Sequence, residues 1–193
     1  MAATPANIFA GLSGSPTPNE LMWIADASGA VLPTDSTTAL DAGFKSVGLV
    51  TTDGATTSTN VSQNDIASFG TYSPTRTIVS QEIIVVRFVA QETNKVTAAI
   101  KQRKALSAVT VTSGAFTSTR GPARDALYAV VVDAIDTLAT NHVRKVYPSV
   151  RLTALGDQQV SFANPYLFDF TFTAYTDASG NSEYEYVKIT GLT

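Results

Sequence analysis

Residues 33–100 of the 193-residue chain read PTDSTTALDAGFKSVGLVTTDGATTSTNVSQNDIASFGTYSPTRTIVSQEIIVVRFVAQETNKVTAAI. In this stretch a short apolar strand over 44–50 precedes the pair Asp53-Gly54, which is typical of a tight hairpin turn because glycine accepts a positive φ. A segment over 55–74, rich in Thr, Ser and Asn, then leads to a long alternating strand over 75–90. This order predicts a mainly β fold with one long inter-strand loop over about 55–74.

The strand expected over 75–90 carries apolar side chains on both faces. They are Ile78, Ile84, Val86 and Phe88 on one face and Val79, Ile83, Val85 and Val89 on the other. A lone small sandwich needs cover on only one face of a strand, so this pattern predicts that both faces are covered. Arg87 interrupts the second face, and we expect it to find a carboxylate partner or an interface edge.

One helix is expected over about 93–103. Thr93 or Asn94 is a suitable N-cap, and Val96, Ala99 and Ile100 form the apolar stripe of a helix that lies on a sheet.

Further strands are expected over 21–25, 108–111, 142–150, 152–155, 166–173 and 184–189. A strand is also expected over 127–135, where a helical stripe fits as well but a run of three valines favours a strand. The row Tyr166, Phe168, Phe170 and Phe172 should form the deepest part of the core, and the pattern as a whole predicts a two-sheet β-sandwich or half-open barrel.

The first 20 residues are expected to form an extended N-terminal arm, because proline and glycine occur there at a density that defeats regular structure. Two readings of this arm stay open: a disordered terminus, or a segment that Ile8 and Phe9 anchor on a neighbouring subunit. Residues 21–193 are expected to form a single domain, a size that buries a sizeable core.

Composition narrows the function classes. Only 15% of the residues are charged while 44% are apolar, the formal net charge is −3, and there is no cysteine. Low charge favours association between copies, and the negative sign argues against a protein that grips a phosphate backbone. No apolar run approaches the ~20 residues of a membrane span, and the N-terminus lacks the basic start of a signal peptide.

No constellation of catalytic residues is visible. The one histidine, His142, has no local carboxylate and nucleophile to complete a triad, and we expect it at the surface or an interface. The spacing of Asp177, Ser179, Asn181 and Glu183 resembles a calcium loop, but the glycine stands at the fourth position rather than the sixth, which favours a hairpin turn. We therefore expect no enzyme, no cofactor and no metal.

The order of several short motifs resembles the major tail proteins, or tail tube proteins, of long non-contractile-tailed bacteriophages. The resemblance is carried by Leu32-Pro33-Thr34-Asp35, residues 39–44, 47–50, Asp53-Gly54, Phe69-Gly70, 78–90, Glu92-Thr93-Asn94, 144–148, Leu155-Gly156-Asp157 and 172–180. It implies a virion protein, assembled in the host cytoplasm, whose six copies close into a ring. The rings would stack into a hollow tube that carries DNA and the tape-measure protein in its lumen without binding them specifically, and tail-tip and tail-terminator proteins would close its ends.

In the resembled family the loop between the two long strands reaches the next ring. The resemblance and the composition together nominate the inter-ring and inter-subunit contacts, namely Ile8, Phe9, Thr57, Asn60, Val61, Gln63, Asp65, Phe69, Tyr72 and Arg87. The alternative is a virion β-sandwich module that binds a receptor or a carbohydrate, for which Trp23, Tyr72 and Tyr166 would be the candidate aromatic platform.

Overall fold

The computed structural model describes residues 13–14, 20–122, 125–136, 141–163 and 165–189. The fold is built on a nine-stranded antiparallel sheet with the strand order β3-β2-β8-β9-β10-β5-β4, to which β1 adds beside β8 and β11 beside β9. The strands are β1 (Ser13–Gly14), β2 (Met22–Asp26), β3 (Lys45–Ser46), β4 (Val50–Ile66), β5 (Arg76–Ala90), β8 (Tyr128–Asp136), β9 (Asn141–Leu155), β10 (Phe168–Tyr175) and β11 (Tyr184–Lys188). A small separate hairpin pairs β6 (Val111–Thr112) with β7 (Ala115–Phe116).

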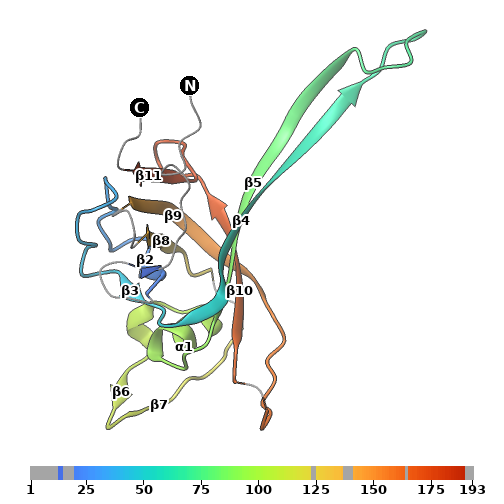
Figure 1. The fold of residues 1–193 in the computed structure, drawn as a ribbon. Helices are drawn as coiled ribbons and strands as arrows, with labels where there is room; N and C mark the ends of the chain where they lie inside the picture. The colour runs from blue at the N-terminus through green and yellow to red at the C-terminus, as the bar shows by residue number, and fades with distance from the viewer. Residues whose placement is uncertain (1–12, 15–19, 123–124, 137–140, 164, 190–193) are drawn as a thin grey trace.

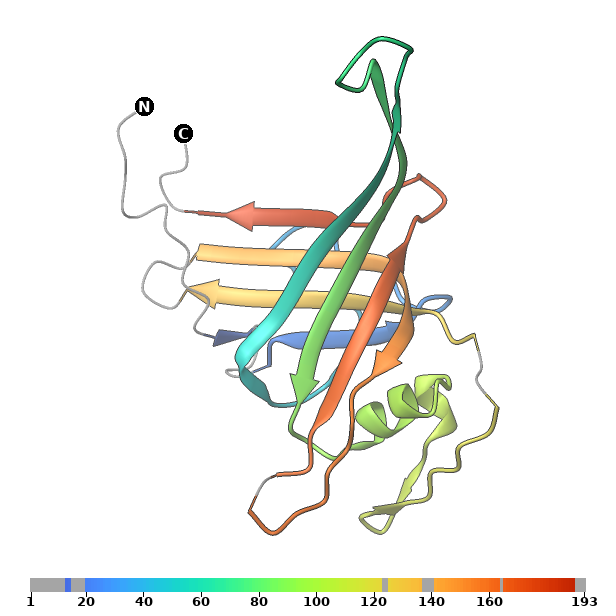
Figure 2. The same cartoon turned by 90° about the vertical axis from the view of Figure 1, so that its right-hand side faces the viewer.

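The sheet folds over on itself into two layers (Figures 1 and 2). β2, β3, β8 and β11 lie in one layer, and β4, β5 and β10 cross them in the other. β9 belongs to both layers, because its first half pairs with β8 and β11 and its second half with β10. The β8 pairing shifts register between Val130↔Tyr147 and Tyr128↔Val150. Pro148 lies in the extra length of β9, as expected for a residue that cannot donate a ladder hydrogen bond.

The core between the layers confirms the expected aromatic row for Phe168, Phe170 and Phe172, whereas Tyr166 lies before β10 and is only half-buried. Phe168, Phe170 and Phe172 are at most 2% exposed, and Phe88 of β5 stacks on Phe172 with ring centroids 5.8 Å apart. Burying such rings contributes about 1.5–3 kcal/mol each. The core is therefore densest along β10, the central strand of the second layer.

The one α-helix of the described residues, α1 (Lys95–Lys101), closes one end of this core. The side-chain oxygen of Asn94 accepts hydrogen bonds from the backbone N–H groups of Val96 and Thr97, which confirms the expected N-cap. The Nδ2 group of Asn94 also donates to the carbonyl of Val47 at 2.9 Å. The cap therefore fixes the helix on the segment between β3 and β4.

A second apolar cluster covers the outer side of β2, β8 and β9. Phe44, Val131 and Val146 form its buried centre, with the partly buried Trp23 and Leu40 packed against them. Segment 27–44 supplies the cover, so Trp23 has a packing role.

Four local expectations are wrong. The strand expected over 44–50 is reduced to the two residues of β3, Lys45–Ser46, and β4 begins only at Val50. Segment 55–66 is not a loop but the greater part of the 17-residue strand β4, and the true connection spans only 67–75. Asp53-Gly54 is not a hairpin turn; it lies inside β4, where the pairing with β5 shifts register between Val50 and Ala55 and Gly54 has a φ of +67°. A short 3-10 helix over Leu106–Ala108 and strand β6 replace the strand expected over 108–111.

Candidate assembly interface

The most conspicuous surface is a two-stranded arm that leaves the body of the protein. Thr57 is the last residue of β4 that is not exposed, and every residue from Ser58 to Glu82 is exposed. Figures 1 and 2 show this hairpin, which we call the arm, projecting well beyond both layers. Phe69 and Tyr72 at its tip are fully exposed, so two aromatic rings have no cover within a single copy. Exposed apolar surface of this kind marks interaction sites.

The arm is apolar on both faces, because directly opposed residues of an antiparallel pair share a face. One face continues the side of β4 that packs on the body at Thr57. It carries the pairs Val61↔Glu82, Gln63↔Val79 and Asp65↔Thr77, and we call it the acidic face. The other face carries Ser62↔Gln81, Asn64↔Ile78 and Ile66↔Arg76. Each face thus leaves aliphatic side chains in water.

A polar relay holds the arm at its root. The hydroxyl groups of Thr57 and Tyr147 are hydrogen-bonded at 2.7 Å, and the Tyr147 hydroxyl also donates to Oε1 of Glu183 at 3.2 Å. Lys145 completes the relay through Glu183 at 3.2 Å and Glu185 at 3.5 Å. Burial, and then the nearby carboxylates, raise the pKa of Tyr147, so its hydroxyl stays protonated over the physiological range. Sequence reasoning missed this relay, because its members come from three separate strands.

The outer face of β5, β9 and β10 combines polar side chains with the partly exposed aliphatic side chains Ile83, Val85 and Val89 of β5. Arg87 donates to both carboxylate oxygens of Asp169, at 2.9 and 2.6 Å, which confirms the expected carboxylate partner. Beside this pair, Thr173 donates to Thr153 at 3.1 Å, and Thr153 donates to the carbonyl of Thr171 at 3.2 Å. The face therefore combines hydroxyl groups with an internally neutralised ion pair.

A buried ionic cluster lies on the side of β8 and β9 that segment 27–44 covers. Arg144 is 1% exposed, donates to Asp133 at 2.7 Å, and also donates to the carbonyl groups of Asp35 and Thr38. His142 is 6% exposed, with its Nδ1 atom 3.7 Å from Asp133. The expectation that it lies at the surface or an interface is therefore wrong, since the side chain is buried within one copy. Burial raises the pKa of Asp133, and the charge of Arg144 opposes that shift.

This cluster fastens segment 35–38 to the sheet. The carboxylate of Asp35 accepts hydrogen bonds from the Thr38 hydroxyl and from the backbone N–H groups of Thr38 and Thr37, the last two at 2.6 and 2.7 Å. These bonds, the hydroxyl bond first, lower the pKa of Asp35. The terminal nitrogen atoms of Arg144 donate to Asp133 and to two carbonyl groups, while its buried Nε has no hydrogen-bond partner among the described residues. These bonds join segment 35–38 to the sheet, so the arrangement is structural. Over the described ranges, no group of three or more His, Cys, Asp or Glu side chains could hold a metal ion.

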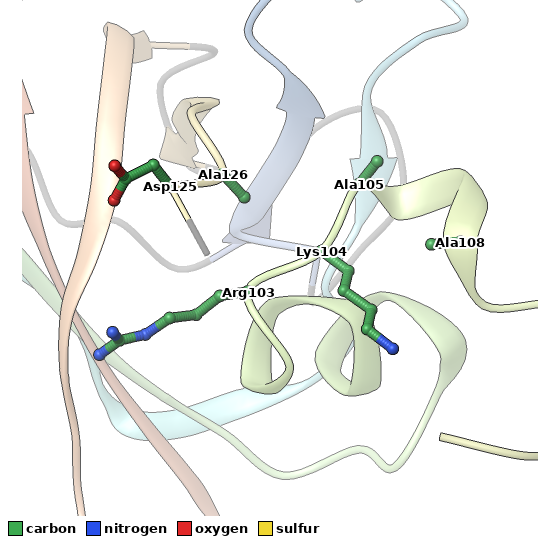
Figure 3. Close-up of a pocket in the computed structure, with 6 residues that line it drawn as sticks. All are labelled: Arg103, Lys104, Ala105, Ala108, Asp125 and Ala126. Carbon is green, nitrogen blue, oxygen red and sulfur yellow. The ribbon is translucent and has the colours of Figure 1, made fainter. Parts of the chain in front are cut away.

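An open pocket of about 480 Å³ lies at the C-terminal end of α1, and we call it the α1 pocket (Figure 3). Arg103 and Lys104 line its α1 side, and Asp125 and Ala126 lie across the opening. Ala105 and Ala108 complete an otherwise apolar lining. Arg103 has a φ of +53°, a left-handed conformation that costs an L-residue about 1 kcal/mol.

The nominated contact residues fall into separate places. Asn60, Val61, Gln63 and Asp65 lie on the exposed part of β4, and Phe69 and Tyr72 lie at the arm tip. Thr57 lies at the arm root, and Arg87 lies on the outer face of the body. Ile8 and Phe9 lie outside the described residues, so the anchoring role of the N-terminal arm stays a prediction. Searching the described part of the chain finds no helix that is long and apolar enough to cross a membrane.

Comparison with known proteins gives one family. A family model described as phage tail tube protein matches residues 8–190. No curated protein matches the chain. Among solved structures, a chain of the "virion of native gene transfer agent (GTA) particle" aligns with 82% of this chain and 99% of its own length, at 9% identity and a TM-score of 0.41.

Proposed function

Because the chain belongs to the phage tail tube protein family, a family of structural virion proteins and not of enzymes, we propose that six copies close into a ring and that the rings stack into a hollow tail tube. The tube would conduct DNA, with the tape-measure protein, towards the host cell. Tail-tip and tail-terminator proteins would cap its ends.

The arm is the observation that carries this proposal. The nine residues of β4 from Ser58 to Ile66 are exposed, and at ~3.3 Å per residue they reach about 30 Å beyond the body. In a single copy the exposed aromatic and aliphatic side chains of the arm bury no apolar surface, so they add no stability to the fold. An adjacent ring would cover these side chains, and repeated contact of this head-to-tail kind generates a stack.

The free strand edges support ring closure. Among the described residues β4 pairs only with β5, so one edge of a 17-residue strand is unpaired. Unpaired edges of this length promote association, and a closed ring removes them. In the proposed ring, strands of neighbouring copies pair through such edges.

We assign the outer face of β5, β9 and β10 to the lumen. A conduit for DNA needs a wall that does not bind phosphate, and the aliphatic side chains of this face, Ile83, Val85 and Val89, are only partly exposed. Arg87 is paired with Asp169, so it has no free charge for a phosphate group, and the neighbouring threonines offer hydroxyl groups. The net charge of −3 acts in the same direction.

Electron microscopy of the concentrated protein, with mass measured by light scattering, tests the proposal. The matched variant replaces residues 60–83 by Asn-Gly, so that the paired residues Thr59 and Ile84 are joined by a two-residue turn. We expect tubes of uniform width from the native chain, and folded rings or monomers without stacking from the variant. A native chain that stays monomeric at high concentration, with or without tail-tip protein, would contradict the proposal.

A further inference from the structure

We propose that the acidic face of the arm docks on the α1 pocket of a copy in the adjacent ring. This inference rests on the proposed stacking and names the surface that receives the arm. The occupant of the pocket is therefore a second copy of this chain.

The arm contributes an apolar surface with uncompensated negative charge. Val61 and Val79 are 48% and 57% exposed on the acidic face. Asp65 accepts a hydrogen bond from the Thr77 hydroxyl, which leaves its charge unneutralised. Glu82 is exposed and, within the described ranges, faces no cation. The acidic face therefore needs a partner that is apolar in its middle and positively charged at its rim.

The α1 pocket has this composition. Its alanine side chains, Ala105, Ala108 and Ala126, provide an apolar floor, and Arg103 and Lys104 provide the cationic rim. Lys104 donates only to neutral groups of Thr119, and the side chain of Arg103 has no hydrogen bond or ion pair in the described structure. Asp125, the one acidic residue of the lining, lies 3.4 Å from Arg151, which offsets its charge.

The left-handed backbone conformation of Arg103 is a second, independent indication that its side chain has a function. The residue follows the last turn of α1, where its N–H donates to the carbonyl of Ile100 and its φ is +53°. Glycine is the residue that accepts this conformation without cost. Local strain of this kind persists where the side chain serves a function.

The two surfaces cannot meet within one copy. The arm projects from one end of the body, and α1 with the pocket residues lies towards the other (Figures 2 and 3). Contact between them joins the head of one molecule to the tail of the next, which extends into a stack and does not close on itself.

Two kinds of variant test the docking. Arg103→Gly relieves the left-handed strain, so we expect a melting temperature about 2 °C higher and yet a critical concentration for tube formation about tenfold higher. Arg103→Glu and Glu82→Arg should each raise the critical concentration about tenfold as well. The chain that carries both Arg103→Glu and Glu82→Arg should recover native assembly, because the ion pair is restored in reverse.

Lys188→Glu is the matched control for charge reversal, since Lys188 is exposed on β11, a strand that lies in the other layer from the arm and away from α1 (Figure 2). If native tubes form and Arg103→Gly leaves their critical concentration unchanged, or if the double reversal stays as defective as the single ones, the docking is wrong while the stacking stands. If the native chain forms no tubes at all, both proposals fall.

Discussion

Replacing Tyr147 with phenylalanine removes the hydroxyl group that ties the root of the arm to the body. The ring is fully buried and stays in place, so the change deletes two hydrogen bonds and little else: 2.7 Å to Thr57 and 3.2 Å to Glu183. Each such bond contributes about 0.5–1.5 kcal/mol. Glu183 keeps Lys145, and Thr57 is only half-buried, so we expect a total loss of about 1–2 kcal/mol.

Thermal unfolding followed by circular dichroism measures that loss, as a decrease in melting temperature of about 3–6 °C for a chain of this length. The pH dependence provides a second check. Because burial raises the pKa of Tyr147 in the folded state, the native chain loses stability as the pH rises above about 10, where the unfolded tyrosine ionises. Tyr147→Phe lacks this loss, so the stability difference between the two chains should shrink above that pH and stay constant below it.

The direction of the arm is measured by electron–electron distances between spin labels. The chain has no cysteine, so labels at Asn64→Cys and Lys188→Cys report only on the arm and the body. Tyr147→Phe should broaden the distance distribution. Tyr128→Phe is the control, because it removes a partly buried 2.7 Å hydrogen bond to the Lys104 carbonyl, away from the arm. Equal distributions for the native chain and Tyr147→Phe, with no change in melting temperature, would refute the reasoning.

Arg144→Ala should destabilise the fold by about 3–5 kcal/mol in denaturant unfolding, because it strands the buried carboxylate of Asp133 and frees segment 35–38; a loss under 1 kcal/mol would contradict the structural role. The hydrogen bonds of Asp35 lower its pKa below the ordinary value of 3.8. The ionised carboxylate therefore contributes stability above pH 3.8, and this contribution is lost as the pH falls further. Asp35→Asn should flatten the acid limb of a stability–pH profile and leave the alkaline limb unchanged. Phe170→Ala should cost about 3–5 kcal/mol of folding stability, whereas Phe69→Ala at the arm tip should leave folding within about 0.5 kcal/mol and weaken only tube formation, as sedimentation would show.

Sequence periodicity is sufficient to predict a strand where one face of that strand is buried within the same copy. β10 alternates aromatic and polar residues and lies within two residues of its predicted bounds, and the Asn94 cap follows from local chemistry. For Arg87 the sequence predicted a carboxylate partner or an interface edge, but it did not identify Asp169 as that carboxylate. The outer part of β4 could not be recognised in this way. Its residues from Ser58 to Ile66 have neither a buried face nor strong strand propensity, and they are held as a strand by their register with β5.

The buried cluster shows a different limit. A charged residue is normally expected at the surface, so His142 and Arg144 gave no sign of burial. The signal lay in the pairing of two strands: Asp133 and Arg144 are directly opposed in the register of β8 and β9. A register derived for this hairpin would have placed the two charges side by side and made their joint burial plausible.

The composition of the arm argues that it is made to be covered. Soluble proteins protect exposed strand edges with charged residues, lysine above all, which prevent further pairing. Residues 58–82 contain only three charged residues, Asp65, Arg76 and Glu82, and no lysine. An unprotected ribbon of this length would be a liability in a protein that works alone. It is consistent with a subunit whose arm is buried by its neighbours, and it leaves the few charges free to select the surface on which the arm docks.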